Sequence, residues 1–140
     1  MRIHLALPVH NIQKTRDFYS LLFRSQPSKQ KPDYVKFEPE DLMVNISFYQ
    51  GTPDTCRHLG IQLDTAQALD SEYDRLRQAE VLSKARETAV CCYAKQDKFW
   101  VKDPDGYEWE IYLRLEDTQT KMSEDSSCCQ TEAVRTGCAC

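Results

Sequence analysis

The sequence predicts an α+β fold in which one unit, a strand followed by a helix and two or three further strands, occurs twice. Segments of alternating apolar and polar residues indicate the strands, and apolar residues at helical spacing indicate the two helices. The segment His4-Leu5-Ala6-Leu7 at the start of the first unit returns as His58-Leu59-Gly60-Ile61 at the start of the second. We interpret this recurrence as an internal duplication.

The first unit is expected to contain one strand, one helix and two more strands. The residues from Ile3 to Val9 alternate as those of a half-buried strand do. A helix is predicted from about Thr15 to Phe23, with Thr15 as its N-cap. Two further strands are predicted over Tyr34 to Phe37 and Leu42 to Tyr49.

The second unit follows the same order. The residues from Arg57 to Leu63 alternate in the same phase as the first strand, and a helix is predicted from about Thr65 to Glu80. The remaining strands are predicted over Thr88 to Ala94, Lys98 to Lys102 and Tyr107 to Leu113, with the turn Asp103-Pro104-Asp105-Gly106 between the last two.

The composition predicts one globular domain over residues 1–115, with its two units at about 2–50 and 56–115. A chain of 140 residues with 41% hydrophobic residues is long enough to bury one core. A net charge of -4 offers no basic patch for nucleic acid. No apolar run approaches the roughly 18 residues of a membrane span, and the first residues lack a signal peptide's apolar stretch. We therefore expect a cytoplasmic protein that binds neither nucleic acid nor membranes.

The chain contains seven cysteines, and their number and distribution argue against a disulfide framework. An odd number of thiols, in a protein expected in the reducing cytosol, is typical of free cysteines. Residues 116–140 are predicted to be a flexible, disordered tail, because apolar periodicity stops there. Whether the tail thiols bind soft ions or have no function stays open; they are Cys128, Cys129, Cys138 and Cys140.

Two histidines and one glutamate are candidates for a metal site. His4 and His58 oppose the apolar residues of their strands, and Glu110 does so in the last strand, with Glu108 as the competing carboxylate. If the two units form one curved sheet, the two imidazoles and Glu110 converge. Such a facial triad leaves open positions for dioxygen and substrate on Fe(II), while Mn, Zn, Ni or Co are alternatives. The opposing interpretation is that each histidine is an ordinary hydrogen-bonded or surface residue.

The adjacent cysteines Cys91 and Cys92 are candidates for chelating one soft atom. Neighbouring thiols rarely form a disulfide with each other, because the eight-membered ring strains the peptide between them. As thiolates they can share a soft ion; the alternative is two small buried residues in a strand. Successive side chains of a regular strand point to opposite faces, so a chelating pair requires a bulge or a mobile loop. The polar segment from Ser83 to Thr88 is expected to be that loop.

Two stretches of the sequence resemble a known superfamily, and the resemblance covers residues 2–115. They are similar to segments of the vicinal oxygen chelate proteins, which include glyoxalase I, fosfomycin-resistance proteins, extradiol dioxygenases and bleomycin-binding proteins. The resemblance implies two βαβββ modules that form a cup-shaped mixed sheet around one divalent metal, with His4, His58 and Glu110 as the ligands. The stretches are Leu7-Pro8-Val9-His10-Asn11-Ile12, leading to Phe18-Tyr19, and Asp103-Pro104-Asp105-Gly106-Tyr107-Glu108-Trp109-Glu110.

Within the superfamily, the run Cys91-Cys92-Tyr93-Ala94-Lys95-Gln96-Asp97-Lys98-Phe99-Trp100-Val101 is similar to organoarsenical carbon–arsenic lyases and their cadmium-induced relatives. The resemblance implies that Cys91 and Cys92 bind a trivalent organoarsenical, such as methylarsonous acid or an aromatic arsenical. Fe(II) and dioxygen would then cleave its carbon–arsenic bond to give arsenite, for arsenic resistance. Some members have glutamine at the position of His4, whereas this chain has the complete triad.

Two other functions and two assembly states stay open at this point. The chain could be a non-enzymatic cadmium- or arsenic-binding protein, or a metalloenzyme like the glyoxalases or fosfomycin-resistance proteins that does not need the cysteines. Because both units lie in one chain, a monomer would hold a whole site, and a homodimer is also compatible.

Overall fold

A computed structural model describes residues 3–54, 59–91 and 94–119 of the chain. The chain divides into two compact units, the first comprising Met1–Thr55 and Asp103–Tyr107, and the second Cys56–Lys102 and the residues from Glu108 onward. Each unit contains one helix and its own four-stranded mixed sheet, built in the order βαβββ. The predicted α+β class and the twofold repetition of one unit are therefore confirmed.

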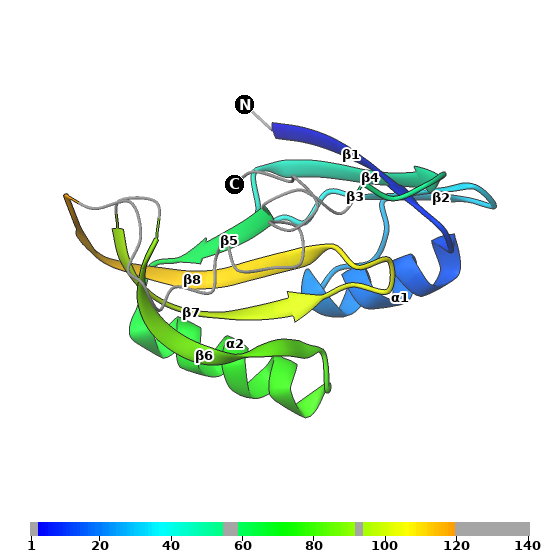
Figure 1. The fold of residues 1–140 in the computed structure, drawn as a ribbon. Helices are drawn as coiled ribbons and strands as arrows, with labels where there is room; N and C mark the ends of the chain where they lie inside the picture. Colours follow the sequence, from blue (N-terminus) through cyan, green and yellow to red (C-terminus); the bar gives the residue numbers. More distant parts are fainter. Residues whose placement is uncertain (1–2, 55–58, 92–93, 120–140) are drawn as a thin grey trace. The chain divides into compact units, whose positions relative to one another are not determined.

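In the first unit, the strands lie in the order β1-β4-β3-β2, so the first and last strands of the unit are neighbours (Figure 1). β1 and β4 are parallel, and the other pairs are antiparallel. The five elements are β1 (Ile3–Val9), α1 (Ile12–Leu22), β2 (Lys29–Lys31), β3 (Tyr34–Phe37) and β4 (Val44–Gln50).

An aromatic cluster forms the core of this unit. Tyr19 of α1 is fully buried and stacks on Phe48 of β4, with 4.0 Å between the ring centroids. Phe23 and Phe37 meet edge to face at 5.8 Å, the usual arrangement of such rings. The apolar residues of β4 that alternate in the sequence thus pack against α1.

Helix α1 begins at Ile12, three residues before the predicted start at Thr15. Asn11 is the N-cap: its backbone is extended, and its Oδ1 accepts a hydrogen bond from the Lys14 amide at 2.9 Å. Thr15 lies inside the helix and donates its hydroxyl hydrogen to the Asn11 carbonyl at 2.9 Å. The prediction was wrong here because asparagine caps a helix as well as threonine does.

The turn from Asp103 to Tyr107 belongs to this first unit and contains the buried Asp103 and the half-buried Asp105. The Asp103 carboxylate accepts hydrogen bonds at 2.9 Å from the Tyr19 hydroxyl and from the amides of Asp105 and Tyr107. Asp105 accepts a hydrogen bond from the His10 amide at 2.8 Å and pairs with the exposed His10 ring. The turn is thereby fixed to the beginning of the unit.

In the second unit, the strands lie in the order β5-β8-β7-β6, which repeats the arrangement of the first. β5 and β8 are parallel, and the other pairs are antiparallel. Thr65 caps α2 as predicted, and its side chain accepts a hydrogen bond from the Ala68 amide at 3.1 Å. The elements are β5 (Leu59–Leu63), α2 (Ala66–Gln78), β6 (Leu82–Cys91), β7 (Ala94–Lys102) and β8 (Glu108–Asp117).

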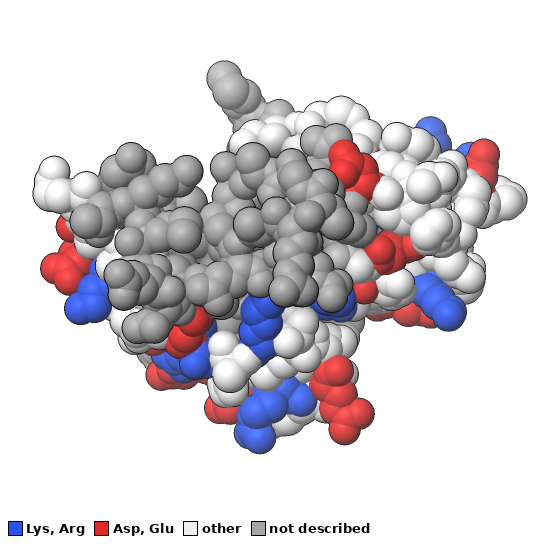
Figure 2. All heavy atoms as spheres, in the orientation of Figure 1, with Lys and Arg blue, Asp and Glu red and all other residues white. Residues whose placement is uncertain are grey.

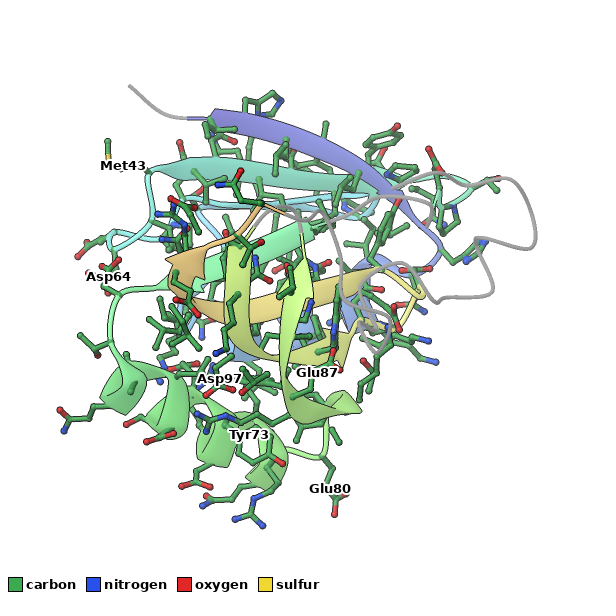
Figure 3. The ribbon with its side chains drawn as sticks, turned by 60° about the vertical axis from the view of Figure 1, so that its left-hand side comes forward. Met43, Asp64, Tyr73, Glu80, Glu87 and Asp97 are labelled. Atoms are coloured by element: carbon green, nitrogen blue, oxygen red, sulfur yellow. The ribbon has the colours of Figure 1, made fainter. Side chains whose placement is uncertain are left out.

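Helix α2 covers one face of this second sheet, and side chains of β7 show which face it is. Tyr73 of α2 meets Phe99 of β7 edge to face at 5.2 Å. Asp97 of β7 accepts two hydrogen bonds from Arg86, at 2.6 and 2.9 Å, and Arg86 also donates to Asp70 of α2. Figure 3 shows Asp97 and Tyr73 on this side. The alternate residues of β7 therefore face away from α2.

Strand β6 corrects two predictions about the segment around the cysteine pair. The residues from Ser83 to Thr88, expected to form a loop, belong to β6, and the strand expected over Thr88 to Ala94 ends at Cys91. The polar side chains of this segment predicted an exposed loop. In the structure, Lys84 and Arg86 lie in a strand because acidic residues of neighbouring strands pair with them. β6 is nevertheless irregular, since its pairing with β7 shifts register on both sides of Lys84.

The last strand, β8, includes Glu116 and Asp117, which were predicted to belong to the tail. The rest of the predicted tail, residues 120–140, lies outside the described residues. Of the helices that the structure describes, neither has the length and apolar character that crossing a bilayer requires. Basic and acidic side chains are interspersed over the coloured surface in Figure 2.

Candidate functional site

Glu110, the predicted carboxylate ligand, is a buried residue of β8 with 3% of its surface exposed. It faces away from α2, because its neighbours Trp109 and Ile111 occupy the core side of the strand. Its Oε1 lies 2.9 Å from the Nζ of Lys98, a residue of β7 with no exposed surface. A buried carboxylate is strongly disfavoured without a compensating charge, and Lys98 supplies that charge.

The same face of the sheet carries a second ion pair and one further buried polar side chain. Lys84 Nζ lies 3.0 Å from Glu108 Oε2 and 4.4 Å from the ring centroid of Trp100. Gln96 is 6% exposed, and its Oε1 has no hydrogen-bond partner in the described part of the chain. Glu108, the competing carboxylate, is thus engaged by Lys84 at the end of β8, whereas Glu110 lies deeper in the strand.

A glycine lies opposite Glu110 in the neighbouring strand. Gly60 of β5 is in register with Glu110, and a Cβ at Gly60 would lie 3.1 Å from the Glu110 carbonyl oxygen and 3.6 Å from its Cβ. The same Cβ would lie 3.5 Å from the Tyr112 ring, so the close pairing of β5 and β8 beside Glu110 requires glycine at this position.

His4, the first predicted imidazole, is an exposed residue of β1 in the first unit. Its Nδ1 lies 3.2 Å from both the main-chain oxygen and the Oδ1 of Asn45, its register partner in β4. The amide of Asn45 is oriented by Glu38, whose Oε1 accepts from Asn45 Nδ2 at 3.4 Å. Because both neighbours of Nδ1 are acceptors, Nδ1 carries a proton, and Nε2 is the ring nitrogen left for a metal. Metal-binding histidines are commonly oriented in this way.

The other predicted site residues lie wholly or partly outside the described residues. His58 and Cys92 are not described, and Cys91 is described only as the last backbone position of β6, paired with Ala94 of β7. Among the described residues there is no group of three or more histidine, cysteine, aspartate and glutamate side chains that would hold a metal ion. The convergence of His4, His58 and Glu110, and the clamp formed by Cys91 and Cys92, therefore stay predictions.

The two described donors fit a divalent transition metal by their chemistry. Glu110 offers a buried carboxylate, and His4 offers an imidazole ring whose Nδ1 is directed at Asn45. Imidazole and carboxylate together are the donor set that iron and its neighbours in the first transition row accept. With His58 as the third donor, the set would be the facial triad that the sequence predicts.

Three residues that neighbour a candidate ligand within its own unit were missed in the sequence: Asn45, Gln96 and Lys98. Lys98 and Gln96 stand at alternate positions of β7, a pattern that places them on one face of the strand. The turn Asp103-Pro104-Asp105-Gly106 joins β7 and β8 into a hairpin in which Trp100 is in register with Glu110. Lys98, two residues before Trp100, is then a diagonal neighbour of Glu110 on the same face, so the pairing of Lys98 with Glu110 could have been predicted. Asn45 gave no such signal, because its role depends on the parallel register between β1 and β4.

Sequence comparison relates most of the chain to known proteins. A trivalent organoarsenical cleaving enzyme from Bacillus sp. strain MD1 is 36% identical over 133 residues, which cover 92% of this chain and 83% of the relative. A protein with the same name from Thermomonospora curvata is 33% identical, over 91% of this chain and 87% of the relative. A cadmium-induced protein from Mycobacterium tuberculosis is 34% identical, over 95% of each chain.

The fold and the family profile agree with these similarities. A crystal structure of a glyoxalase/bleomycin resistance protein/dioxygenase from Alicyclobacillus acidocaldarius superposes with a TM-score of 0.68, covering 83% of this chain and 92% of the other at 17% identity. The profile of the glyoxalase family matches residues 3–111, nearly all of the two units. The chain belongs to the glyoxalase/bleomycin resistance protein/dioxygenase superfamily.

Proposed function

We propose that the protein cleaves the carbon–arsenic bond of trivalent organoarsenicals to give arsenite, in a reaction that requires Fe(II) and dioxygen. The observation that carries this proposal is its similarity, over about nine tenths of the chain, to proteins named as trivalent organoarsenical cleaving enzymes. The adjacent thiols of Cys91 and Cys92 support it, because this substrate class is thiophilic. The role in the cell would be resistance to organoarsenicals.

The cysteine pair is proposed to bind the substrate. Trivalent arsenic in methylarsonous acid carries one carbon and two exchangeable hydroxyl groups. Two thiols can replace these hydroxyls with the release of two water molecules, and the carbon–arsenic bond stays intact. Cys91 and Cys92 would then hold the arsenic in one place, which turns a bimolecular encounter into a positioned reaction.

The metal is proposed to be held by His4, His58 and Glu110. Bound there, Fe(II) would supply the activation of dioxygen that no side chain of the protein can provide. His4 would use its Nε2, since Nδ1 is directed at Asn45. Glu110 would contribute the negative charge, and the burial of its carboxylate would strengthen its interaction with a cation.

Oxygen uptake and arsenite release, measured together, test the proposal. The protein is loaded with Fe(II) without oxygen and given methylarsonous acid, and oxygen is then admitted. The proposal predicts that oxygen consumption and arsenite release begin together and require both the metal and the substrate. Oxygen uptake without arsenite would contradict the proposed bond cleavage.

A second candidate function rests on the similarity to the cadmium-induced protein, which spans 95% of each chain. In that case the thiols would bind soft ions without any reaction. The same experiment separates the two functions, because a binding protein would retain methylarsonous acid and consume no oxygen. A third possibility is a glyoxalase-like metalloenzyme that does not need the cysteines. It would be indicated by a metal-dependent enzymatic activity that persists when Cys91 and Cys92 are both replaced by serine.

A further inference from the structure

The ion pair between Lys98 and Glu110 is the most deeply buried one in the described part of the chain. Its side chains are 0% and 4% exposed, whereas other ion pairs contain at least one partly exposed partner. The Nζ of Lys98 lies 2.9 Å from Glu110 Oε1 but makes no well-directed hydrogen bond in the described residues. The pair therefore neutralises charge without fixing the ammonium group in one hydrogen-bonded position.

Glu110 is also the proposed metal ligand, so the ammonium and a divalent cation compete for one carboxylate. A cation on Glu110 would lie within a few ångströms of Lys98 Nζ, where repulsion between like charges is strong because water is largely excluded. This repulsion favours movement of the Lys98 ammonium group away from Glu110 when a metal binds there.

Gln96 provides an alternative partner for the displaced group. Its Oε1 is a buried acceptor without a hydrogen bond among the described residues, a costly arrangement in a folded protein. Gln96 precedes Lys98 by two residues in β7, so both side chains lie on the same face, about 7 Å apart at their bases. The flexible four-carbon stem of lysine spans such a gap, and its ammonium group offers three donors.

We propose that Lys98 is a two-position counter-ion that regulates metal binding: it pairs with Glu110 until a divalent cation binds, and then moves to the Oε1 of Gln96. The proposal rests on the proposed metal centre at Glu110. It gives Lys98 and Gln96 opposite effects on metal affinity. Lys98 opposes metal binding by occupying the ligand, and Gln96 favours binding by accepting the displaced ammonium.

Metal affinity in single and double variants tests the two positions. Co(II) is used as the probe because its visible absorption reports its coordination and it does not consume oxygen. Lys98→Met removes the charge at nearly constant volume, and should raise the Co(II) affinity by about tenfold or more. Lys98→Arg keeps the charge and should leave the affinity low. Gln96→Leu should lower the affinity by about threefold to tenfold, the loss of one hydrogen bond to a charged group.

The double variant Lys98→Met with Gln96→Leu makes the test specific. If Gln96 acts only by receiving Lys98, the Gln96 substitution should have no effect once Lys98 is methionine. Lys84→Met is the matched control, because it removes an ammonium from the same face while its partner is Glu108 and not Glu110. Its Co(II) affinity should stay within about twofold of the wild-type value.

Thermal unfolding without metal gives a second, independent measurement. Lys98→Met leaves Glu110 buried with its charge uncompensated, so its melting temperature should fall, and Co(II) should raise it by more than in the wild-type protein. Adding Glu110→Gln to Lys98→Met should restore the melting temperature without metal and abolish the response to Co(II).

The outcomes separate this proposal from the metal centre itself. Co(II) binding that needs Glu110 but is equal in the wild type and Lys98→Met would overturn the two-position lysine and leave the metal centre in place. A Gln96→Leu effect that persists in the double variant would overturn the role of Gln96. Failure of Co(II) to bind both the wild type and Lys98→Met would overturn the metal centre and the inference together.

Discussion

At the scale of single residues, two candidate ligand side chains are each held by a neighbouring residue of their own unit. Glu110 is paired with Lys98 inside the second unit, and His4 is oriented by Asn45 inside the first. In both cases the neighbour fixes the chemical form in which the ligand is presented. Lys98 compensates a carboxylate charge, and Asn45 selects the imidazole tautomer.

Replacing Asn45 with leucine should weaken metal binding through His4. The substitution removes the Oδ1 contact but leaves the main-chain oxygen of residue 45, so the loss should be about tenfold, the lower end of the range for such partners. The measurement is Co(II) titration. Glu38→Gln is the control, because it touches the Asn45 amide and not the imidazole. An unchanged affinity in Asn45→Leu would show that His4 is not a ligand or needs no orientation.

Asp103 should make stability depend on pH. Burial raises the pKa of the Asp103 carboxyl above its ordinary value of 3.8, and the charge of Asp105 adds to the rise, while hydrogen bonds from Tyr19 and the turn amides oppose it. The folded protein thus holds this proton more tightly than the unfolded chain does. The contribution of Asp103 to stability should be complete below about pH 3.8 and should fall as pH rises through its folded pKa.

Asp103→Ala tests this linkage by urea unfolding at several pH values. The variant should lose about 3 kcal/mol at neutral pH, because the Tyr19 hydroxyl and two amides lose their acceptor. The loss should be larger near pH 4. The exposed Asp41, replaced with alanine, is the matched control and should lose less than about 0.5 kcal/mol. A loss from Asp103→Ala that grows with rising pH would contradict the direction of the pKa shift.

At the scale of elements, the parallel pair β5 and β8 determines how much space surrounds Glu110. Gly60 and Glu110 are in register across this pair, and the nearest atom to a methyl group added at Gly60 is a main-chain oxygen, which cannot move alone. The two strands would have to separate slightly to admit any side chain. The glycine is therefore a requirement of the strand pairing beside Glu110.

Gly60→Ala should destabilise the protein by about 1–3 kcal/mol through this close contact. Chemical unfolding measures the loss, and the Co(II) affinity should fall with it because the added methyl group also approaches the Glu110 side chain. Gln62→Ala, two residues along the same face of β5, is the matched control and should change stability by less than about 1 kcal/mol. Equal stability of Gly60→Ala and the wild type would show that β5 and β8 adjust without cost.

Most elements could be predicted from the sequence, because their apolar residues alternate or recur at helical spacing. The strand from Ile3 to Val9 has the predicted bounds, and α2 begins after the predicted cap Thr65. The first part of β6, from Leu82 to Glu87, was not recognised as a strand, since its polar residues are satisfied by partners distant in sequence, such as Glu108 for Lys84. The candidate ligands could be selected because they alternate with apolar residues along their strands. The burial of Lys98 against Glu110 could not, because it depends on how two strands pair.

At the scale of the whole molecule, the duplication preserved the framework and allowed the chemistry to diverge. The repeated segments align Ala6 with Gly60, and the registers then align Ser47 with Glu110. Both are buried, but Ser47 donates its hydroxyl hydrogen to the Leu5 carbonyl, whereas Glu110 pairs with Lys98 and is the carboxylate of the proposed metal centre. Two copies of one framework thus present one buried glutamate at this position, consistent with one proposed metal centre per chain.

The proposed function assigns substrate binding and oxygen chemistry to different residues, so each can be removed alone. Cys91→Ser with Cys92→Ser should abolish the binding of methylarsonous acid and leave Co(II) binding within about twofold of the wild-type value. Glu110→Gln should abolish Co(II) binding and leave the binding of methylarsonous acid within about twofold of the wild-type value. Spectroscopic titration with Co(II) and arsenic retention after gel filtration measure the two properties. Loss of both properties in both variants, with the fold intact by circular dichroism, would show that the two sets of residues are not separate.

The most direct test of the account is one turnover in which arsenic binding and arsenite release are measured in sequence. The Fe(II)-loaded protein is mixed with methylarsonous acid without oxygen, freed of unbound arsenic, and then exposed to air. The account predicts that the wild type retains arsenic and releases it as arsenite, that Glu110→Gln retains it without arsenite formation, and that the double cysteine variant retains none. Arsenite released by Glu110→Gln, or by the cysteine variant at the wild-type rate, would contradict it.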